Sequence, residues 1–185
     1  MIKIIDSFFE NQVKLLNIEK FYDARGYFVE SYNKKSLSLL GINDNFVQDN
    51  ESYSKIKFTI RGLHFQIPPY DQSKLITVKQ GSILDIVLDI RLKSNTYGRV
   101  ETIKLDANDD KSLYISSGFA HGFCTLSDNT IVNYKTSNFY SPDHESTICF
   151  NDKNLNINFE NNENNFIISD KDLKCTSFKN FQSPF

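Results

Sequence analysis

Long apolar runs are absent from this sequence of 185 residues. No stretch approaches the roughly 20 apolar residues that a membrane-spanning helix needs, so we expect no transmembrane segment. The N-terminal residues 1–6 also lack the apolar core of a secretory signal, and their pattern is typical of a first strand. Membrane insertion is therefore not indicated.

A surplus of basic charge is absent as well. The chain has 21 Lys and Arg against 23 Asp and Glu, which leaves a formal net charge of −2 at pH 7. Binding of nucleic acid usually requires a broad basic surface, so we expect no nucleic-acid partner. A small anionic ligand remains possible, because a few local cations are enough to bind it.

Cysteines are few, odd in number and widely spaced. Cys124, Cys149 and Cys175 form neither a disulfide framework nor a zinc motif in the sequence. We therefore expect three buried or neutral thiols, and a reducing cytoplasm is the simplest compartment for them.

Motifs for phosphate and metal binding are missing too. Neither G-x-x-x-x-G-K-[ST] nor G-x-G-x-x-G occurs, so a bound nucleotide would have to be held by side chains. A double-stranded β-helix with a metal often supplies His-x-His, a later Glu and a further His. Here Gln66 takes the second position after His64, and the Lys74 ammonium would repel a divalent cation. We expect no metal and no other cofactor.

Aromatic residues, by contrast, are abundant, with 16 Phe and 9 Tyr. Many short strand-like runs alternate with turn residues, which predicts one mainly β domain over residues 1–185, built as a sandwich or barrel. Residues 33–40 predict a short helix that begins after Asn33 and is stopped by Gly41.

The strongest strand signal lies at residues 83–90. Both faces of this run are partly apolar, so we expect a central strand. Asp85 and Asp89 share one face of it. Their carboxylates must then meet either a polar cavity or structural partners.

Two of the three histidines lie in glycine-framed, aromatic-rich segments, 61–66 (RGLHFQ) and 118–123 (GFAHGF). Imidazole ordinarily titrates near neutral pH, so His64 is a candidate general base. Lys74 and Arg61 could stabilise an oxyanion. The glycines around His121 permit a tight backbone. The alternative for both segments is a purely structural role, in which the charges are solvated and the histidines are packed in the fold.

A third candidate group follows further along the chain. Tyr134 could donate a proton, and the Tyr140 ring could stack on a flat ligand ring, with Glu145 nearby. Packed tyrosines are the alternative interpretation. Asp170 to Asp172, near the C-terminus, could be a solvated turn.

In order, these motifs resemble those of the dTDP-4-dehydrorhamnose 3,5-epimerase family, dTDP-sugar epimerases of the cupin superfamily. The resemblance covers about residues 2 to 172. It implies a mainly β cupin jelly-roll (a double-stranded β-helix) with a few short helices, a homodimer and no metal. The motifs that carry it are D-x-R-G-x-F-x-E (23–30), QDN-x-S (48–52), RGLHFQ (61–66), KL (74–75), D-x-x-x-D-x-R (85–91), GFAHGF (118–123), YK (134–135), YSP (140–142) and ND (151–152).

The resemblance also implies roles for individual residues. His64 is the base, oriented by the carboxylate of Asp172, with Asp170 as the alternative partner. Tyr134 is the acid on the opposite sugar face, and Lys74, with Arg61, stabilises the enolate. Tyr140 stacks on thymine, and the segment with Arg25 and Glu30 can reach the partner subunit's site. The nucleotide-sugar-binding positions are Arg25, Glu30, Gln48, Asn50, Arg61, His121, Glu145 and Lys171.

The implied reaction converts dTDP-4-dehydro-6-deoxy-D-glucose to dTDP-4-dehydro-L-rhamnose, for surface polysaccharide. Three alternatives remain: inversion at C3 alone, action on another nucleotide-linked 4-keto sugar, and a non-catalytic sugar-nucleotide-binding cupin. The sequence departs from the family at Ser116-Ser117, where proline is usual, and at Phe150 and Phe159, where tryptophan is usual. These changes affect packing more than chemistry.

Overall fold

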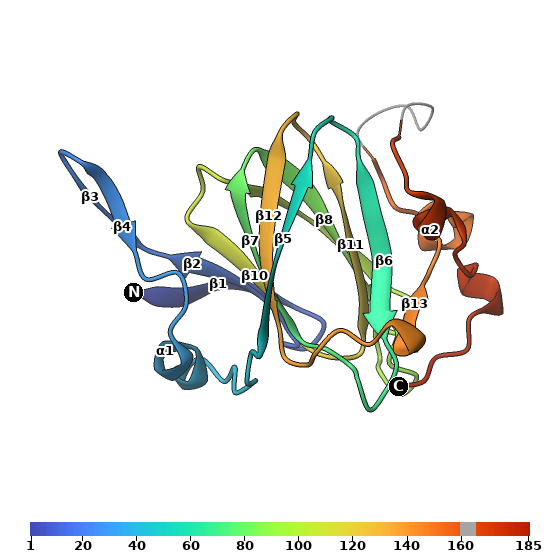
Figure 1. Ribbon diagram of the computed structural model, residues 1–185. Coiled ribbons are helices and arrows are strands. Elements are labelled where there is room, and N and C mark those ends of the chain that lie inside the picture. The colour runs from blue at the N-terminus through green and yellow to red at the C-terminus, as the bar shows by residue number, and fades with distance from the viewer. Residues whose placement is uncertain (160–165) are drawn as a thin grey trace.

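The computed structural model describes residues 1–159 and 166–185. Two antiparallel sheets face one another (Figure 1). This is the mainly β jelly-roll architecture that the sequence predicts. In order, the six-stranded sheet contains β1 (Ile2–Phe8), β2 (Val13–Ile18), β10 (Lys111–Ile115), β7 (Lys74–Gln80), β12 (Thr130–Thr136) and β5 (Gln48–Ser54). The five-stranded sheet contains β13 (Glu145–Thr147), β6 (Ile60–Gln66), β11 (Phe119–Thr125), β8 (Ser82–Asp89) and β9 (Val100–Asp106).

The predicted central strand is β8, which lies between β11 and β9. Ile83 and Val87 pack into the core between the two sheets, while Ile86 and Leu88 pack into a second core on the other face. That second core is covered by the C-terminal segment, including Phe181 and other partly buried aromatic side chains. Both faces of β8 are therefore buried, which explains why apolar residues occur on both of them.

The predicted helix is α1 (Lys34–Leu39). The Asn33 side chain caps it by accepting a hydrogen bond from the Ser36 backbone N–H at 3.0 Å. Gly41 follows with a φ of +77°, a backbone conformation that glycine adopts without strain. Leu37 packs from this helix against the outer face of the six-stranded sheet.

The polar, Asn-rich composition of residues 151–165 predicts a surface crossing, and part of this segment, residues 160–165, lies outside the described residues. Before them, η2 (Lys153–Leu155) buries Leu155, and Phe159 packs with Phe150. After them come α2 (Asp170–Leu173) and η4 (Phe178–Asn180). A further turn of 3₁₀ helix, η1 (Pro142–His144), precedes β13.

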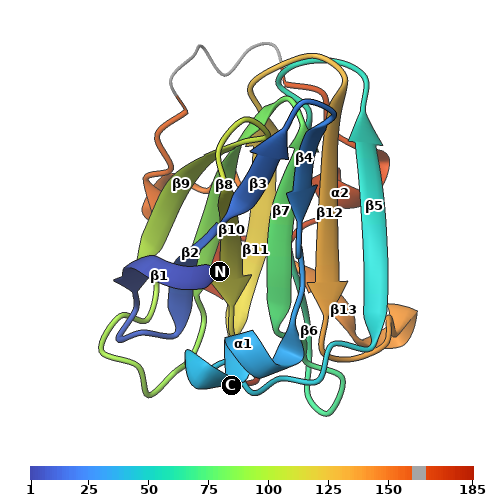
Figure 2. The ribbon, with the colours of Figure 1, turned by 90° about the vertical axis from the view of Figure 1, so that its left-hand side faces the viewer.

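A two-stranded hairpin of β3 (Lys20–Asp23) and β4 (Gly26–Val29) stands away from the sandwich. It projects from the outer face of the six-stranded sheet, on the side opposite α2 (Figures 1 and 2). Its aromatic side chains are exposed, with Phe28 71% and Tyr22 68% accessible. Within residues 1–159 and 166–185, no helix is long and apolar enough to cross a membrane.

The cysteines depart from the sequence-based expectation. Cys149 and Cys175 form a disulfide with their Cα atoms 5.0 Å apart, so the prediction of free thiols is wrong for this pair. A parallel bridge between Ile148 and Thr176 brings the two segments together, and a spacing of 26 residues does not reveal that contact. Cys124 is free and buried, as predicted; burial raises its thiol pKa to about 11.

Loss of this disulfide should destabilise the fold. Reduction releases a closed loop that spans 26 residues, so we expect the free energy of unfolding to fall by about 3 kcal/mol. Denaturant unfolding with and without a thiol reductant measures the effect. In a Cys149→Ser/Cys175→Ser variant, the reductant should change nothing further. Identical unfolding midpoints for the oxidised and reduced wild-type chain would contradict the prediction.

Candidate active site

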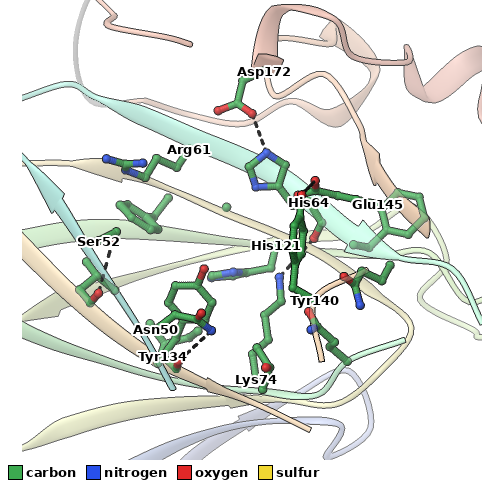
Figure 3. Close-up of a pocket in the computed structure, with 18 of the residues that line it drawn as sticks. Asn50, Ser52, Arg61, His64, Lys74, His121, Tyr134, Tyr140, Glu145 and Asp172 are labelled. Atoms are coloured by element: carbon green, nitrogen blue, oxygen red, sulfur yellow. Dashed lines mark hydrogen bonds and ion pairs between the residues drawn. The ribbon is translucent and has the colours of Figure 1, made fainter. Parts of the chain in front are cut away.

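A cavity of about 430 Å³ lies between the two sheets (Figure 3). Its walls come from β5, β7 and β12 on one side and from β6 and β11 on the other, with α2 at the rim. Most of the sequence-predicted site residues line it: Gln48, Asn50, Arg61, His64, Lys74, His121, Tyr134, Tyr140, Glu145, Lys171 and Asp172.

Two glycines bring the two histidine motifs together. Gly62 has a φ of +122°, and a Cβ atom placed on it would lie 2.5 Å from the Gly122 Cα atom. Only glycine at both positions allows β6 and β11 to approach this closely. His64 and His121 are then direct cross-strand partners, and both line the cavity.

His64 is bound to Asp172 of α2. The imidazole Nε2 atom lies 2.6 Å from Asp172 Oδ1, and the two side chains are 26% and 5% exposed. Burial alone would raise the pKa of the Asp172 carboxyl. The hydrogen bond and charge of His64, with further hydrogen bonds from the Gly62 backbone and Ser169, outweigh this and hold its pKa below the ordinary value.

The protonation of this pair follows from that shift. Asp172 is an ionised acceptor, so Nε2 of His64 must donate. In the neutral imidazole Nδ1 is then unprotonated, and it points away from Asp172 toward the cavity (Figure 3). Asp172, and not Asp170, makes this contact, and its backbone N–H also donates to the Ser169 hydroxyl that caps α2.

Lys74 reaches across the cavity from the other sheet. Its Nζ atom lies 3.4 Å from the His64 backbone carbonyl oxygen, to which it donates. Burial lowers the pKa of this amine to about 8, although Asp85 and Glu145 act in the opposite direction. At neutral pH the side chain is therefore a poorly solvated cation beside the histidine, which suits stabilisation of an oxyanion.

Tyr134 lies on β12, in the sheet that faces His64 (Figure 3). Burial raises the pKa of its phenol, and Arg61 partly opposes this. The phenol thus carries its proton at neutral pH. Arg61 is anchored at the rim by hydrogen bonds to the Ser54 hydroxyl and the Tyr53 carbonyl.

Tyr140, Glu145 and Lys171 form a polar group at the mouth of the cavity. The Tyr140 hydroxyl donates to Glu145 at 2.8 Å, and Lys171 pairs with the same carboxylate. Burial would raise the pKa of Glu145, but these partners lower it. Tyr140 is 49% exposed, so its side chain is accessible to a ligand.

Gln48, Asn50 and Gln66 are held by hydrogen bonds. Gln48 donates to Asn50 at 2.8 Å and accepts from the Tyr140 backbone N–H. Gln66 donates to the Tyr70 and Phe139 carbonyls and accepts from the Ser141 N–H. Gln66 thus fixes the loop before Tyr140, a role that the sequence alone does not indicate.

Arg25 and Glu30 are not brought to this cavity. Arg25 lies at the tip of the β3–β4 hairpin, 88% exposed, and pairs only with Asp23 among the described residues. Glu30 is exposed just after β4. The hairpin projects away from the sandwich, so within one chain neither side chain joins the other predicted site residues (Figure 1).

Comparison with known proteins identifies the family. The family model described as dTDP-4-dehydrorhamnose 3,5-epimerase matches residues 11–180. The chain belongs to this family. It is therefore an epimerase, an enzyme of the isomerase class.

Individual relatives in the family are similar over most of their length. The dTDP-4-dehydrorhamnose 3,5-epimerase of Shigella flexneri is 43% identical over 159 residues, 85% of this chain and 86% of that protein. A crystal structure of the Bacillus anthracis enzyme with TDP and PPi bound is 46% identical, covers 96% of this chain and 99% of its own, and has a TM-score of 0.92. The Legionella pneumophila enzyme in complex with dTDP-4-keto-L-rhamnose is 35% identical, with a TM-score of 0.91 over 98% and 95% of the two chains.

Proposed function

We propose that this cavity converts dTDP-4-dehydro-6-deoxy-D-glucose to dTDP-4-dehydro-L-rhamnose by inverting C3 and C5. One observation carries the proposal: a histidine base and a neutral tyrosine lie on opposite sheets, on either side of one cavity, with a partly buried cation between the sheets. A 4-keto sugar needs these three groups for inversion beside its carbonyl.

The chemistry follows from the ketone at C4. A proton on C3 or C5 is acidic only because its removal leaves an enolate. His64 takes that proton on Nδ1, and Asp172 stabilises the resulting imidazolium through Nε2. Lys74 offsets the negative charge that develops on the ketone oxygen.

Inversion requires a new proton on the opposite face of the sugar. Tyr134 supplies it from the six-stranded sheet, and its raised pKa keeps the phenol protonated until that step. The tyrosinate and the imidazolium then exchange their protons with water. The same sequence of events at the second carbon completes the reaction.

The nucleotide part of the substrate occupies the mouth of the cavity. The half-exposed Tyr140 ring is placed to stack on thymine, and Lys171, paired with Glu145, lies next to it. Gln48, Asn50, Arg61 and His121 present polar groups further along the lining, for the phosphates and the sugar. In this arrangement each of these residues contacts the nucleotide or the sugar of the substrate.

Product analysis tests the proposal. The purified enzyme is incubated with dTDP-4-dehydro-6-deoxy-D-glucose, and the configuration at C3 and C5 is read from proton coupling constants by NMR. Inversion at both carbons is expected. Inversion at C3 alone would select the monoepimerase alternative, and tight binding without any product would select a non-catalytic sugar-nucleotide-binding cupin.

We also infer that the enzyme is a homodimer in which the β3–β4 hairpin completes the partner's site. The exposed aromatic surface of the hairpin, formed by Phe21, Tyr22, Tyr27 and Phe28, supports this. So does the position of Arg25 and Glu30 on it, outside the cavity of their own chain. Arg25 and Glu30 are suited to binding anions and hydroxyls, but on the hairpin they can contact a substrate only if it is bound in the cavity of a second chain.

Mixed dimers distinguish this arrangement from a site built by one chain. Arg25→Ala and His64→Asn variants should each be nearly inactive. After subunit exchange, a dimer with one chain of each kind has one site with both native residues, so about a quarter of wild-type activity should return. No recovery, with exchange verified by mass spectrometry of the intact dimers, would contradict action in trans.

The expected compartment is the cytoplasm, because a nucleoside-diphosphate sugar is multiply charged and does not cross a bilayer unaided. The expected destination of the product is a surface polysaccharide such as a lipopolysaccharide O-antigen. Both follow from the substrate proposed and not from the thiols, two of which are in the disulfide.

A further inference from the structure

Asp85 is a fully buried carboxylate on the inner face of β8. It is 0% exposed, and its neighbours on the same face of the strand, Ile83 and Val87, belong to the apolar core between the sheets. Asp85 does not line the cavity. A charge in such surroundings is costly unless partners compensate for it, so its contacts indicate its role.

Both oxygens of Asp85 contact His121. The distances from Nε2 are 2.9 and 3.1 Å. Nε2 therefore carries the proton and donates it to the carboxylate. Burial lowers the pKa of His121 and outweighs the opposing effect of Asp85. The lowered pKa keeps the imidazole ring neutral.

The second ring nitrogen of His121 then becomes an acceptor. A neutral imidazole protonated on Nε2 has a lone pair on Nδ1. Among the described residues Nδ1 has no hydrogen-bond partner, and His121 lines the cavity. In this tautomer Nδ1 can accept a hydrogen bond from a sugar hydroxyl. In the other tautomer Nδ1 carries the proton and cannot accept.

Asp85 also acts on Lys74 electrostatically. Lys74 contacts the His64 carbonyl, and the carboxylates of Asp85 on β8 and Glu145 on β13 act on its charge. The other titratable groups that line the cavity with it are His64, His121, Tyr134, Tyr140, Lys171 and Asp172. Glu145 is already paired with Lys171. Within residues 1–159 and 166–185, Asp85 pairs with no lysine or arginine, so its charge remains to compensate Lys74.

We propose that Asp85 is a positioning residue for the epimerisation: it holds His121 in the tautomer that accepts from a sugar hydroxyl, and it supplies a negative charge that compensates Lys74. The inference rests on the proposed roles of Lys74 and His121. Asp85 touches no substrate and acts only through these two side chains.

An Asp85→Asn variant tests the electrostatic part. Asparagine fits the same space but removes the negative charge, so the Lys74 pKa, now about 8, should fall by about one unit or more. Because the ammonium is present only below that pKa, the alkaline limb of kcat should move to lower pH by the same amount. At pH 8 the rate should fall roughly fivefold from this cause alone.

Asp89→Asn is the matched control. Asp89 lies on the same face of the same strand and is also 0% exposed, but its partners are Arg91, Ser94 and Thr96. Its replacement disturbs the fold without touching the Lys74 environment. The Asp89 variant should therefore keep the alkaline limb of the wild-type enzyme, whatever stability it loses.

Two NMR measurements decide the inference without relying on turnover. Titration of ¹³C-labelled lysine side chains reads the Lys74 pKa directly; an unchanged value in Asp85→Asn would overturn the electrostatic role. The ¹⁵N shifts of His121 in the wild-type protein report the tautomer even if the variant does not fold. Protonation on Nδ1, or on both nitrogens at neutral pH, would overturn the positioning role. An inactive wild-type enzyme would instead count against the proposed function.

Discussion

Replacing His64 by asparagine should abolish proton exchange at C3 and C5 of the sugar. Asparagine can still donate a hydrogen bond to Asp172, so the buried carboxylate keeps a partner, but it cannot accept a carbon-bound proton. A general base contributes roughly 10²- to 10⁴-fold, and here it begins both inversions. We expect the rate to fall by at least about 10³-fold, with dTDP affinity nearly unchanged.

The measurement is deuterium uptake from D₂O, followed by NMR, alongside calorimetric titration with dTDP. His144→Asn is the matched control, because that histidine packs against the Tyr70 ring and hydrogen-bonds to Ser141, and neither it nor these partners line the cavity. The His144→Asn variant should exchange the C3 and C5 protons at the wild-type rate. Exchange that persisted in the His64 variant would remove this residue from the role of base.

Replacing Lys74 by methionine should have the second-largest effect. Methionine keeps most of the aliphatic volume and removes the only ammonium that reaches the His64 carbonyl within the described residues. Loss of one preorganised group that stabilises an oxyanion costs about 10²- to 10³-fold in kcat. The enolate forms only during the reaction, so kcat should fall far more than KM changes.

Steady-state kinetics at pH 7 check this expectation. Lys79→Met is the control, since Lys79 lies on the same strand with its side chain exposed. A Lys74 variant that kept half of the wild-type kcat would rule out the proposed stabilisation. A pure increase in KM would reassign Lys74 to binding of the ground state.

Local sequence patterns predict most of the fold. Alternating apolar residues locate the strands, and the cap at Asn33 with Gly41 locates α1, because these signals depend on neighbours close in sequence. The interior position of β8 is predictable for the same reason, since burial on both faces leaves apolar residues pointing to both sides in residues 83–90. The pairing order of the strands carries no comparable local signal.

The site is predictable where motifs identify its members, but their contacts are not. Asp172 lies 108 residues from His64, and only the fold shows that it, and not Asp170, makes the contact. Asp85 shows the same limit. Its sequence pattern allows either a cavity or a structural partner, and the folded chain places it against His121, beneath the cavity wall.

Neither the disulfide nor the position of the hairpin relative to the cavity could be predicted in this way. Cys149 and Cys175 meet through a bridge between segments with irregular backbone, and no spacing rule indicates that contact. Arg25 and Glu30 match the motif of the family but lie outside the cavity of their own chain. In the proposed homodimer their placement depends on a second copy, which the pattern of one chain does not describe.

Deuterium labelling by the wild-type enzyme tests the central claim most directly. Incubation with dTDP-4-dehydro-6-deoxy-D-glucose in D₂O should place deuterium at both C3 and C5, because each inversion removes a carbon-bound proton and returns one derived from solvent. Inversion of these centres without label, or label at neither carbon, would contradict proton transfer by His64 and Tyr134 across this cavity.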